Sequence, residues 1–283
     1  MTDILITGGS GFLGKRLISR LDKFNYSYIS LSSKDGDINN AETFQSISKV
    51  KFVFHLAGKS FVPQSWEEDD NLFSTNILGT RNVVQFCKKV DAKLIMASSY
   101  IYGHPRNLPV KENHPIEPNN PYALSKWIAE QIVEFDSKHN NLNAVILRIF
   151  NIYGNGQSEN FLIPKIISHV ENNEEIKIFD LKPKRDFVYI EDVVDALILS
   201  LKIKNGFHRF NIGSGESFSV EQIIQMIQKI YGSKLKISCQ EKTRRNEVNN
   251  VVADISHARK VLKWNPNYNF YEGLKEYIDE RFN

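Results

Sequence analysis

A tyrosine and a lysine one helical turn apart are the residues whose types and spacing most directly suggest chemistry. Tyr122 and Lys126 stand at positions i and i+4 of the segment Pro-Tyr-Ala-Leu-Ser-Lys and therefore share one face of a helix. A free phenol has a pKa near 10, and a neighbouring ammonium lowers it. Alone, such a pair is more often structural. Ser98, at the end of a predicted strand, adds a hydroxyl that can bond a substrate carbonyl while Tyr122 protonates it.

A glycine-rich turn between a strand and a helix predicts where a dinucleotide binds. Gly8, Gly11 and Gly14 follow the strand-like run 3–7 and open a helical pattern. One glycine permits the sharp turn, one lets a pyrophosphate approach the backbone, and one allows the helix to pack closely on the strand. A structural turn in some other α/β protein is the alternative. The predicted contacts to a nicotinamide cofactor here are Gly8, Gly11, Phe12, Leu13 and Gly14.

The end of the second predicted strand bears on which cofactor binds. An acid there would bond the ribose 2′-hydroxyl of NAD, but the run 28–32 continues into Ser32, Ser33 and Lys34. Hydroxyls and an ammonium suit the 2′-phosphate of NADP, so we expect NADP. In the alternative, Lys34 is solvated and Asp35 or Asp37 reaches the ribose of NAD. The other predicted cofactor contacts are Asp37, Ile38, Leu56, Ala57, Gly58 and Lys126.

The elements that position these residues alternate along the chain. Apolar runs occur at 3–7, 28–32, 52–57, 93–98 and 144–149, and helical patterns occur at 11–23, 71–90 and 121–138. Such alternation predicts a doubly wound parallel sheet of the Rossmann type, with ligands at the carboxyl ends of its strands. We expect a dinucleotide-binding domain at 1–155, to which 186–213 returns. A smaller mixed α/β substrate lobe is expected from 156–185 and 214–283.

Composition limits the class of protein. With 283 residues, 41% of them hydrophobic and 24% charged, the chain can bury a large core. Its net charge of +3 is scattered, so we expect no nucleic-acid partner. Cys87 and Cys239 lack the spacing of a zinc site, and we expect reduced thiols and no metal. The sequence shows no signal-peptide pattern and no apolar run long enough for a membrane, so we expect a cytoplasmic protein.

In their order along the chain, these motifs resemble the extended short-chain dehydrogenase/reductase superfamily, in the branch that modifies nucleotide sugars. The likeness covers nearly the whole chain. Further matching segments are 55–58, 76–80, 98–103, 148–154, 185–192 and 211–213, with Arg244 following.

The resemblance implies a nucleotide-sugar substrate and a homodimer. It implies that Asn151, Arg185 and Arg244 contact the diphosphate and that Ser99 and Tyr100 contact the substrate. The arginine fork suits phosphate oxygens. In the alternative for Arg185, it forms an internal ion pair with Asp186. His55 is read as a core or cofactor-flanking residue and not as a catalyst, and His104 as a loop histidine that could instead touch substrate.

Three reaction classes follow from the resemblance: dehydration, epimerisation and keto-reduction. Dehydratases of this branch carry Asp-Glu where this chain has Ser99-Tyr100, and bifunctional epimerase-reductases carry Cys at the position of Tyr100. The remaining hypotheses are an NADP(H)-dependent 4-keto-6-deoxy sugar nucleotide reductase and, alternatively, an NAD-dependent nucleotide-sugar 4-epimerase. The block from Ser60 to Trp66 favours the reductase. A non-catalytic cofactor-binding regulator is a third hypothesis, disfavoured by the intact Ser98, Tyr122 and Lys126.

Overall fold

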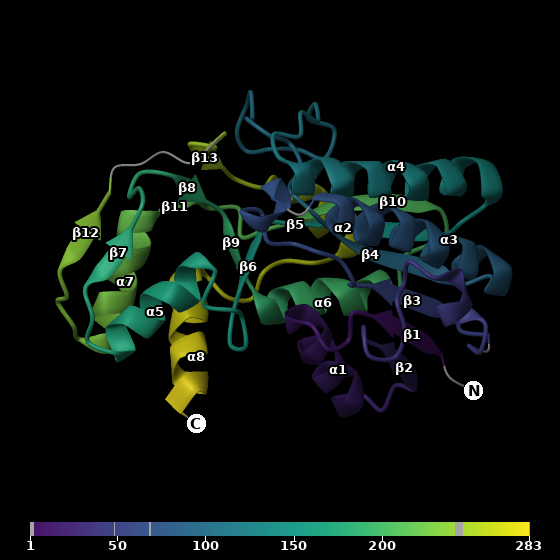
Figure 1. Ribbon diagram of the computed structural model, residues 1–283, viewed down its shortest axis with the longest axis horizontal. Helices are drawn as coiled ribbons and strands as arrows, with labels where there is room; N and C mark the ends of the chain where they lie inside the picture. The colour runs from purple at the N-terminus through teal and green to yellow at the C-terminus, as the bar shows by residue number, and fades with distance from the viewer. Residues whose placement is uncertain (1–2, 48, 68, 241–245, 283) are drawn as a thin grey trace.

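The computed structural model describes residues 3–47, 49–67, 69–240 and 246–282, and its centre is a parallel sheet (Figure 1). The strands of this sheet, in spatial order, are β10 (Phe207–Ile212), β5 (Ala144–Ile149), β4 (Lys93–Ser99), β3 (Phe52–His55), β1 (Ile4–Thr7) and β2 (Tyr28–Leu31). Every neighbouring pair is parallel. The five strands predicted from the sequence are present, and the doubly wound α/β fold is confirmed.

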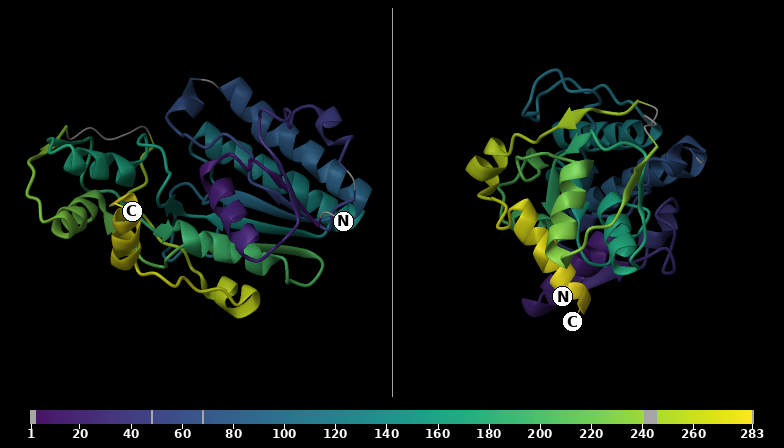
Figure 2. Two further views of the ribbon diagram at one scale, coloured as in Figure 1. Left: turned by 90° about the horizontal axis from the view of Figure 1, so that it is seen from below. Right: turned by 90° about the vertical axis from the view of Figure 1, so that its left-hand side faces the viewer.

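Helices cover both faces of the sheet (Figures 1 and 2). One face carries α1 (Phe12–Lys23) and α6 (Ile190–Ser200), and the other carries α3 (Gly79–Val90) and α4 (Pro121–Asn140). Along β1, Ile4 and Ile6 pack in the hydrophobic core under α1 and α6, and Leu5 packs in the core under α3 and α4. Burial on both faces explains why the strands read as continuous apolar runs. No helix in the described ranges is long and apolar enough to cross a membrane.

Smaller elements surround a third hydrophobic core at one end of the sheet (Figure 1). The helices are α5 (Leu162–Glu171), α7 (Val220–Tyr231) and α8 (Phe270–Phe282). The strand sets are β6 (Asn151–Tyr153) with β9 (Phe187–Tyr189), β7 (Ile176–Ile178) with β12 (Ile237–Cys239), and β8 (Lys184–Arg185) between β11 (Phe218–Ser219) and β13 (Asn250–Val251). This core contains residues that precede β10 in the chain and residues that follow it. The domain boundaries given above stay a prediction.

Short helical turns complete the chain. They are η1 (Ala41–Phe44), η2 (Gln64–Trp66), α2 (Asp69–Phe73), the π-turn η3 (Ser74–Leu78) that runs into α3, and the π-turn η4 (Ala258–Leu262). A π-turn therefore interrupts the predicted helix 71–90, and Asn76 is its buried residue.

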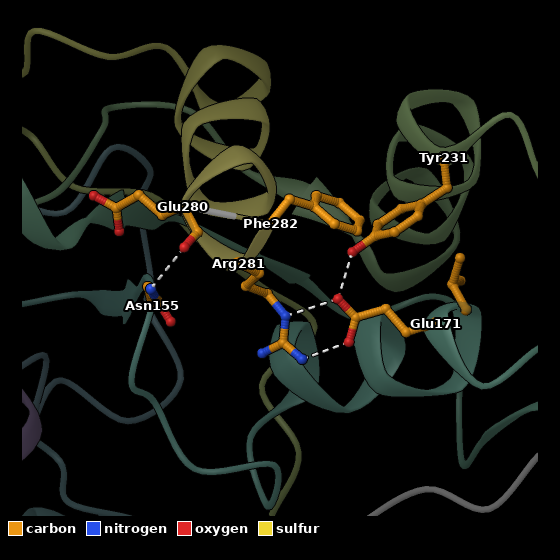
Figure 3. Close-up of a pocket in the computed structure, with 7 residues that line it drawn as sticks. Asn155, Glu171, Tyr231, Glu280, Arg281 and Phe282 are labelled. Carbon is orange, nitrogen blue, oxygen red and sulfur yellow. Dashed lines mark hydrogen bonds and ion pairs between the residues drawn. The ribbon is translucent and has the colours of Figure 1, made fainter.

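Ion pairs hold α8 in place. Arg16 of α1 bonds Glu191 of α6 and Glu280 of α8. The next residue of α8, Arg281, pairs with Glu171 of α5 through two contacts, and the Tyr231 hydroxyl donates to the same carboxylate at 2.8 Å (Figure 3). Glu171, Tyr231 and Arg281 line a cavity of about 700 Å³, and none of the predicted site residues lines it.

Candidate active site

The glycine turn is built by contacts that leave no room for side chains. The amides of Gly8 and Gly9 donate to the Leu31 carbonyl of β2 at 2.8 and 3.2 Å. A Cβ on Gly14 would lie 2.3 Å from the Gly8 oxygen, and one on Gly8, at φ +78°, would lie 2.6 Å from the Ala57 nitrogen. Gly9 was missed by the spacing argument, although its Cβ would lie 1.9 Å from Ser30 Oγ. These glycines let β1, β2 and α1 meet closely.

Gly11 differs from them because it is exposed at the start of α1. A Cβ there would meet only the Gly8 oxygen within 4 Å, at 3.2 Å, and no side chain caps this helix end. The side chains of Phe12 and Leu13 pack toward the cores, so their backbone amides are what this end offers to a ligand. Open backbone donors at a helix N-terminus fit a pyrophosphate.

The tip of β2 carries an acid after all. Asp35 lies beyond the strand, but its backbone turns back to donate to the Ser32 carbonyl at 3.0 Å. Its Oδ2 accepts from the Ser32 amide at 2.8 Å and from Ser32 Oγ at 2.6 Å, and these bonds lower the pKa of the carboxyl. Ser33 and Lys34 are exposed. The sequence analysis gave Asp35 only as an alternative, because it followed the strand and not the turn.

The loop after β2 is anchored to α3. Asn82 donates from Nδ2 to the carbonyls of Ile38 and Asn39, each at 2.9 Å. Ile38 is buried, whereas Asp37 is exposed and accepts from the Asn39 amide at 2.9 Å. The structure thus brings this predicted cofactor segment to the same sheet edge as Ser32.

The end of β3 is held beside the glycine turn. His55 is buried between Thr7 at 2.8 Å and Thr80 at 3.0 Å, and burial lowers its pKa to about 3, which confirms its reading as a core residue. The Leu56 amide donates to the Thr7 carbonyl at 3.0 Å, and the Ala57 amide contacts Thr7 Oγ1 at 3.4 Å. Leu56 and Ala57 are therefore fixed against β1.

Asn76 ties this segment to the tyrosine helix. Its Oδ1 accepts from the Lys59 amide at 2.9 Å, and its Nδ2 donates to the Lys59 carbonyl at 3.1 Å and to Ser125 Oγ at 2.9 Å. A Cβ on Gly58 would lie 2.9 Å from the same Oδ1. The buried Asn76 thus links the end of β3 to α4.

The two serines at the end of β4 face opposite ways. Ser98 is buried, and its Oγ donates to Glu130 at 2.6 Å within a cluster in which Arg148 Nη2 lies 2.7 Å from Glu130. The Ser99 hydroxyl, one residue on, forms the hydrogen bond to Tyr122. The two contacts differ because successive strand residues point to opposite faces, and the expectation that Ser98 bonds a substrate carbonyl stays a prediction.

Tyr122 and Lys126 lie in the first turns of α4. The helix start is fixed by Asn120, whose Oδ1 accepts from the Ala123 amide at 2.8 Å, and by Pro121 at the first position. Burial raises the pKa of Tyr122 to about 12, against the hydrogen bond from Ser99. Burial lowers the pKa of Lys126 to about 8, and its Nζ donates to the Ala97 carbonyl at 2.7 Å. Without a ligand, then, the phenol pKa is raised and not lowered as the spacing suggested.

Tyr100 is held by contacts with Asn151 and Phe150. The Tyr100 hydroxyl donates to Asn151 Oδ1 at 3.2 Å, and its ring stacks on Phe150 with centroids 5.2 Å apart. Asn151 donates from Nδ2 to the Asp186 carbonyl at 2.9 Å. Tyr100 also acts on Tyr122 electrostatically, raising its pKa. Two phenols therefore share this site.

Arg185 and Asp186 have separate partners, which rules out the ion pair between them. Arg185 pairs with Glu247 and donates to the Val248 carbonyl. The buried Asp186 carboxylate accepts the amides of Ser214 at 2.7 Å, Gly215 at 3.0 Å and Ala253 at 3.0 Å. Arg244 lies outside the described residues.

A cavity of about 310 Å³ lies beside Gly58 and Lys59, after the end of β3. It is lined by Gly58, Lys59, Ser60, Phe61, Gln64, Ser65, Asn71, Leu72, Ser158, Asn160 and Phe161. Phe61 and Phe161 meet edge to face across it, with centroids 5.9 Å apart. Hydroxyl and amide groups beside aromatic rings suit a polar ring-shaped ligand. The described residues contain no cluster of His, Cys, Asp or Glu that could hold a metal.

Comparison with known proteins places the chain. The model of the NAD dependent epimerase/dehydratase family matches residues 4–213. The chain belongs to this family. The putative UDP-glucose 4-epimerase of Methanocaldococcus jannaschii is 33% identical over 98% of this chain and 97% of that protein. The dTDP-4-dehydro-6-deoxyglucose reductase of Escherichia coli is 31% identical over 97% of this chain and 96% of that protein.

A solved member has the same fold over its full length. The structure of MoeE5 in complex with UDP-glucuronic acid and NAD superposes with a TM-score of 0.91 at 25% identity, covering 99% of both chains. The recognition of a nucleotide-sugar epimerase/dehydratase/reductase family from the sequence is confirmed. The family match alone does not separate Ser98 from Ser99. The contacts of the two hydroxyls differ, and no spacing in the sequence indicated that difference.

Proposed function

We propose that the protein reduces the 4-keto group of a nucleotide-activated 6-deoxyhexose, with a nicotinamide cofactor bound at the glycine turn. The fit of the cofactor is supported by the open Gly11 backbone and the uncapped start of α1. A bound reduced nicotinamide supplies the hydride. The sugar would occupy the cavity between Lys59 and Phe161, next to Gly58.

In this proposal Tyr122 is the proton donor. A pKa raised to about 12 keeps the phenol protonated at neutral pH, which suits donation to a carbonyl oxygen that gains negative charge. Ser99, hydrogen-bonded to that phenol, polarises the same oxygen. Lys126, with its pKa near 8, remains mostly an ammonium at pH 7 and attracts the phenolate left after proton transfer.

Tyr100 is the observation that carries the choice of reduction. Its ring is fixed on Phe150 and its hydroxyl on Asn151, so a large rigid side chain lies beside Tyr122. An epimerase must release the keto sugar, turn it over and present its other face, whereas a reductase uses one face. The fixed ring of Tyr100 favours a single orientation of the sugar.

A nucleotide-sugar 4-epimerase is the second candidate. It is favoured by the identity to the epimerase relative, which is as high as that to the reductase. It would use Ser99, Tyr122 and Lys126 both for the oxidation of C4 of the sugar and for its reduction on the other face.

One assay tests the proposal against this alternative. Purified protein is mixed with NADH or NADPH and a panel of 4-keto-6-deoxy sugar nucleotides, and absorbance of the reduced nicotinamide is followed. We expect stoichiometric loss of the reduced cofactor with at least one sugar. Interconversion of UDP-glucose and UDP-galactose without net consumption of cofactor would support the epimerase instead.

A further inference from the structure

We infer that Glu130 is a positioning residue for the proposed reaction, because its buried carboxylate keeps Lys126 both charged and fixed against the end of β4. This inference rests on the proposed function, in which Lys126 attracts the phenolate of Tyr122, and it adds a group that acts only through Lys126. The three residues stand four apart along α4 and therefore share one face of this helix.

Two adjacent residues of β4 hold the side chains of Lys126 and Glu130. Lys126 donates from Nζ to the Ala97 carbonyl at 2.7 Å. The next strand residue, Ser98, donates from Oγ to Glu130 Oε1 at 2.6 Å. Lys126 is 7% exposed and Glu130 is fully buried. Because one helical turn is bonded to two consecutive strand residues, the Lys126 side chain has little freedom to move.

Two arginines fix the carboxylate of Glu130. Arg148 Nε lies 3.1 Å from both carboxylate oxygens, and Arg148 Nη2 lies 2.7 Å from Oε2. Arg148 also donates to the Tyr102 hydroxyl and the Glu112 carbonyl, each at 3.0 Å. Arg209 Nε lies 3.2 Å from Glu130 Oε2. Removal of the carboxylate would leave these two cations inside the protein, where they disfavour a third cation at Lys126.

The charge of Glu130 matters because Lys126 is an ammonium away from water. Burial lowers the pKa of Lys126 to about 8, and the Glu130 carboxylate acts against this lowering. Two neutral groups also face Lys126. Burial, with the charge of Lys126, lowers the pKa of His55 on β3 to about 3, and burial raises the pKa of Tyr122 to about 12. Glu130 therefore supplies negative charge that these neighbours do not.

The test is the titration of Lys126 itself, which needs no sugar. Full-length protein carrying lysine labelled with ¹³C at Cε is followed by NMR from about pH 6 to about pH 11, and the Lys126 signal is identified by its loss in Lys126→Arg. We expect Glu130→Gln to lower the pKa of Lys126 from about 8 to about 7. The ammonium fraction at pH 8 then falls about five-fold, and kcat at that pH should fall with it.

Two variants separate the charge of Glu130 from its packing. Glu130→Asp keeps the charge and shortens the side chain, so it should lower the Tm as Glu130→Gln does but leave the pKa of Lys126 near 8. Glu134→Gln is the matched control, because Glu134 lies one turn further along α4 and its neutralisation changes the net charge equally. We expect it to leave the Lys126 titration unchanged.

Arg209→Gln keeps the inference testable if Glu130→Gln does not fold. Arg209 is partly exposed, and its loss removes a cation from the Glu130 carboxylate, so the pKa of Lys126 should rise. An unchanged pKa in the folded variants, or an equal fall in Glu130→Gln and Glu130→Asp, would overturn the inference and leave the reductase proposal standing. Absence of turnover with every keto sugar would refute the reductase, while the titration would still decide the role of Glu130.

Discussion

Substitution of the two adjacent serines of β4 separates a structural hydroxyl from a catalytic one. Ser98 donates to Glu130 at 2.6 Å inside a buried ion cluster, whereas Ser99 bonds Tyr122. The change to alanine is the same at both positions, so each variant is the control for the other. The two variants are expected to lose different properties.

The Ser98→Ala variant should lose stability and keep its turnover. A hydrogen bond to a charged group contributes about 1.5–3 kcal/mol, and Glu130 keeps its contacts with Arg148. At about 2–4 °C per kcal/mol for chains of this size, the Tm should fall by about 3–12 °C. The kcat should remain within about two-fold of the wild type, because no atom of Ser98 reaches the reacting oxygen in the proposed site.

The Ser99→Ala variant should behave in the opposite way. Loss of a donor to a developing oxyanion lowers kcat by about 10²–10³-fold, while a half-buried hydroxyl contributes less than about 1 kcal/mol to folding. Single-turnover oxidation of the reduced cofactor and thermal unfolding measure the two properties separately. An inactive Ser98→Ala of normal Tm, beside an active Ser99→Ala, would refute the assignment.

Three further results are expected. Tyr122→Phe should abolish most turnover and leave the dissociation constant of the cofactor within about two-fold, and near-normal turnover would exclude the phenol as donor. Glu130→Gln should lower the free energy of unfolding by about 3–5 kcal/mol in denaturant titration, since it leaves the buried Arg148 without its partner; an unchanged midpoint would contradict this. The pKa of His55 is about 3 in the folded chain and near 6.5 in the unfolded chain, so between these pH values only the unfolded chain binds the proton. The free energy of unfolding should therefore fall by about 1.4 kcal/mol for each pH unit from pH 6.5 toward pH 3. His55→Gln should flatten this pH dependence, and an equally steep dependence in the variant would assign it to other groups.

Much of the fold followed from the sequence because local patterns carried it. Buried strands require continuous apolar runs, and Asn120 with Pro121 marked the start of α4 to the residue. The glycine turn was recognisable because close backbone contacts exclude side chains. These features depend on residues near one another in the chain.

The details of the site depended on contacts that no spacing records. Ser98 and Ser99 point to opposite faces of the sheet, and the partner of Ser98, Glu130, comes from another element. Asp35 reaches the β2 tip through a turn, and Arg185 pairs with Glu247 from a distant segment. Long-range geometry decided each of these cases.

The packing of α8 determines the order in which the molecule can be completed during synthesis. All strands of the central sheet precede residue 213, whereas the core between α5 and α7 also needs Phe270, Leu274 and Ile278 of α8. A growing chain can therefore close its sheet while the apolar side of α5 is still uncovered and prone to association. When α8 docks, Glu280 reaches Arg16 on the first helix. A chain truncated before α8 would consequently keep its glycine turn and lose the ion pair between Glu280 and Arg16 of α1.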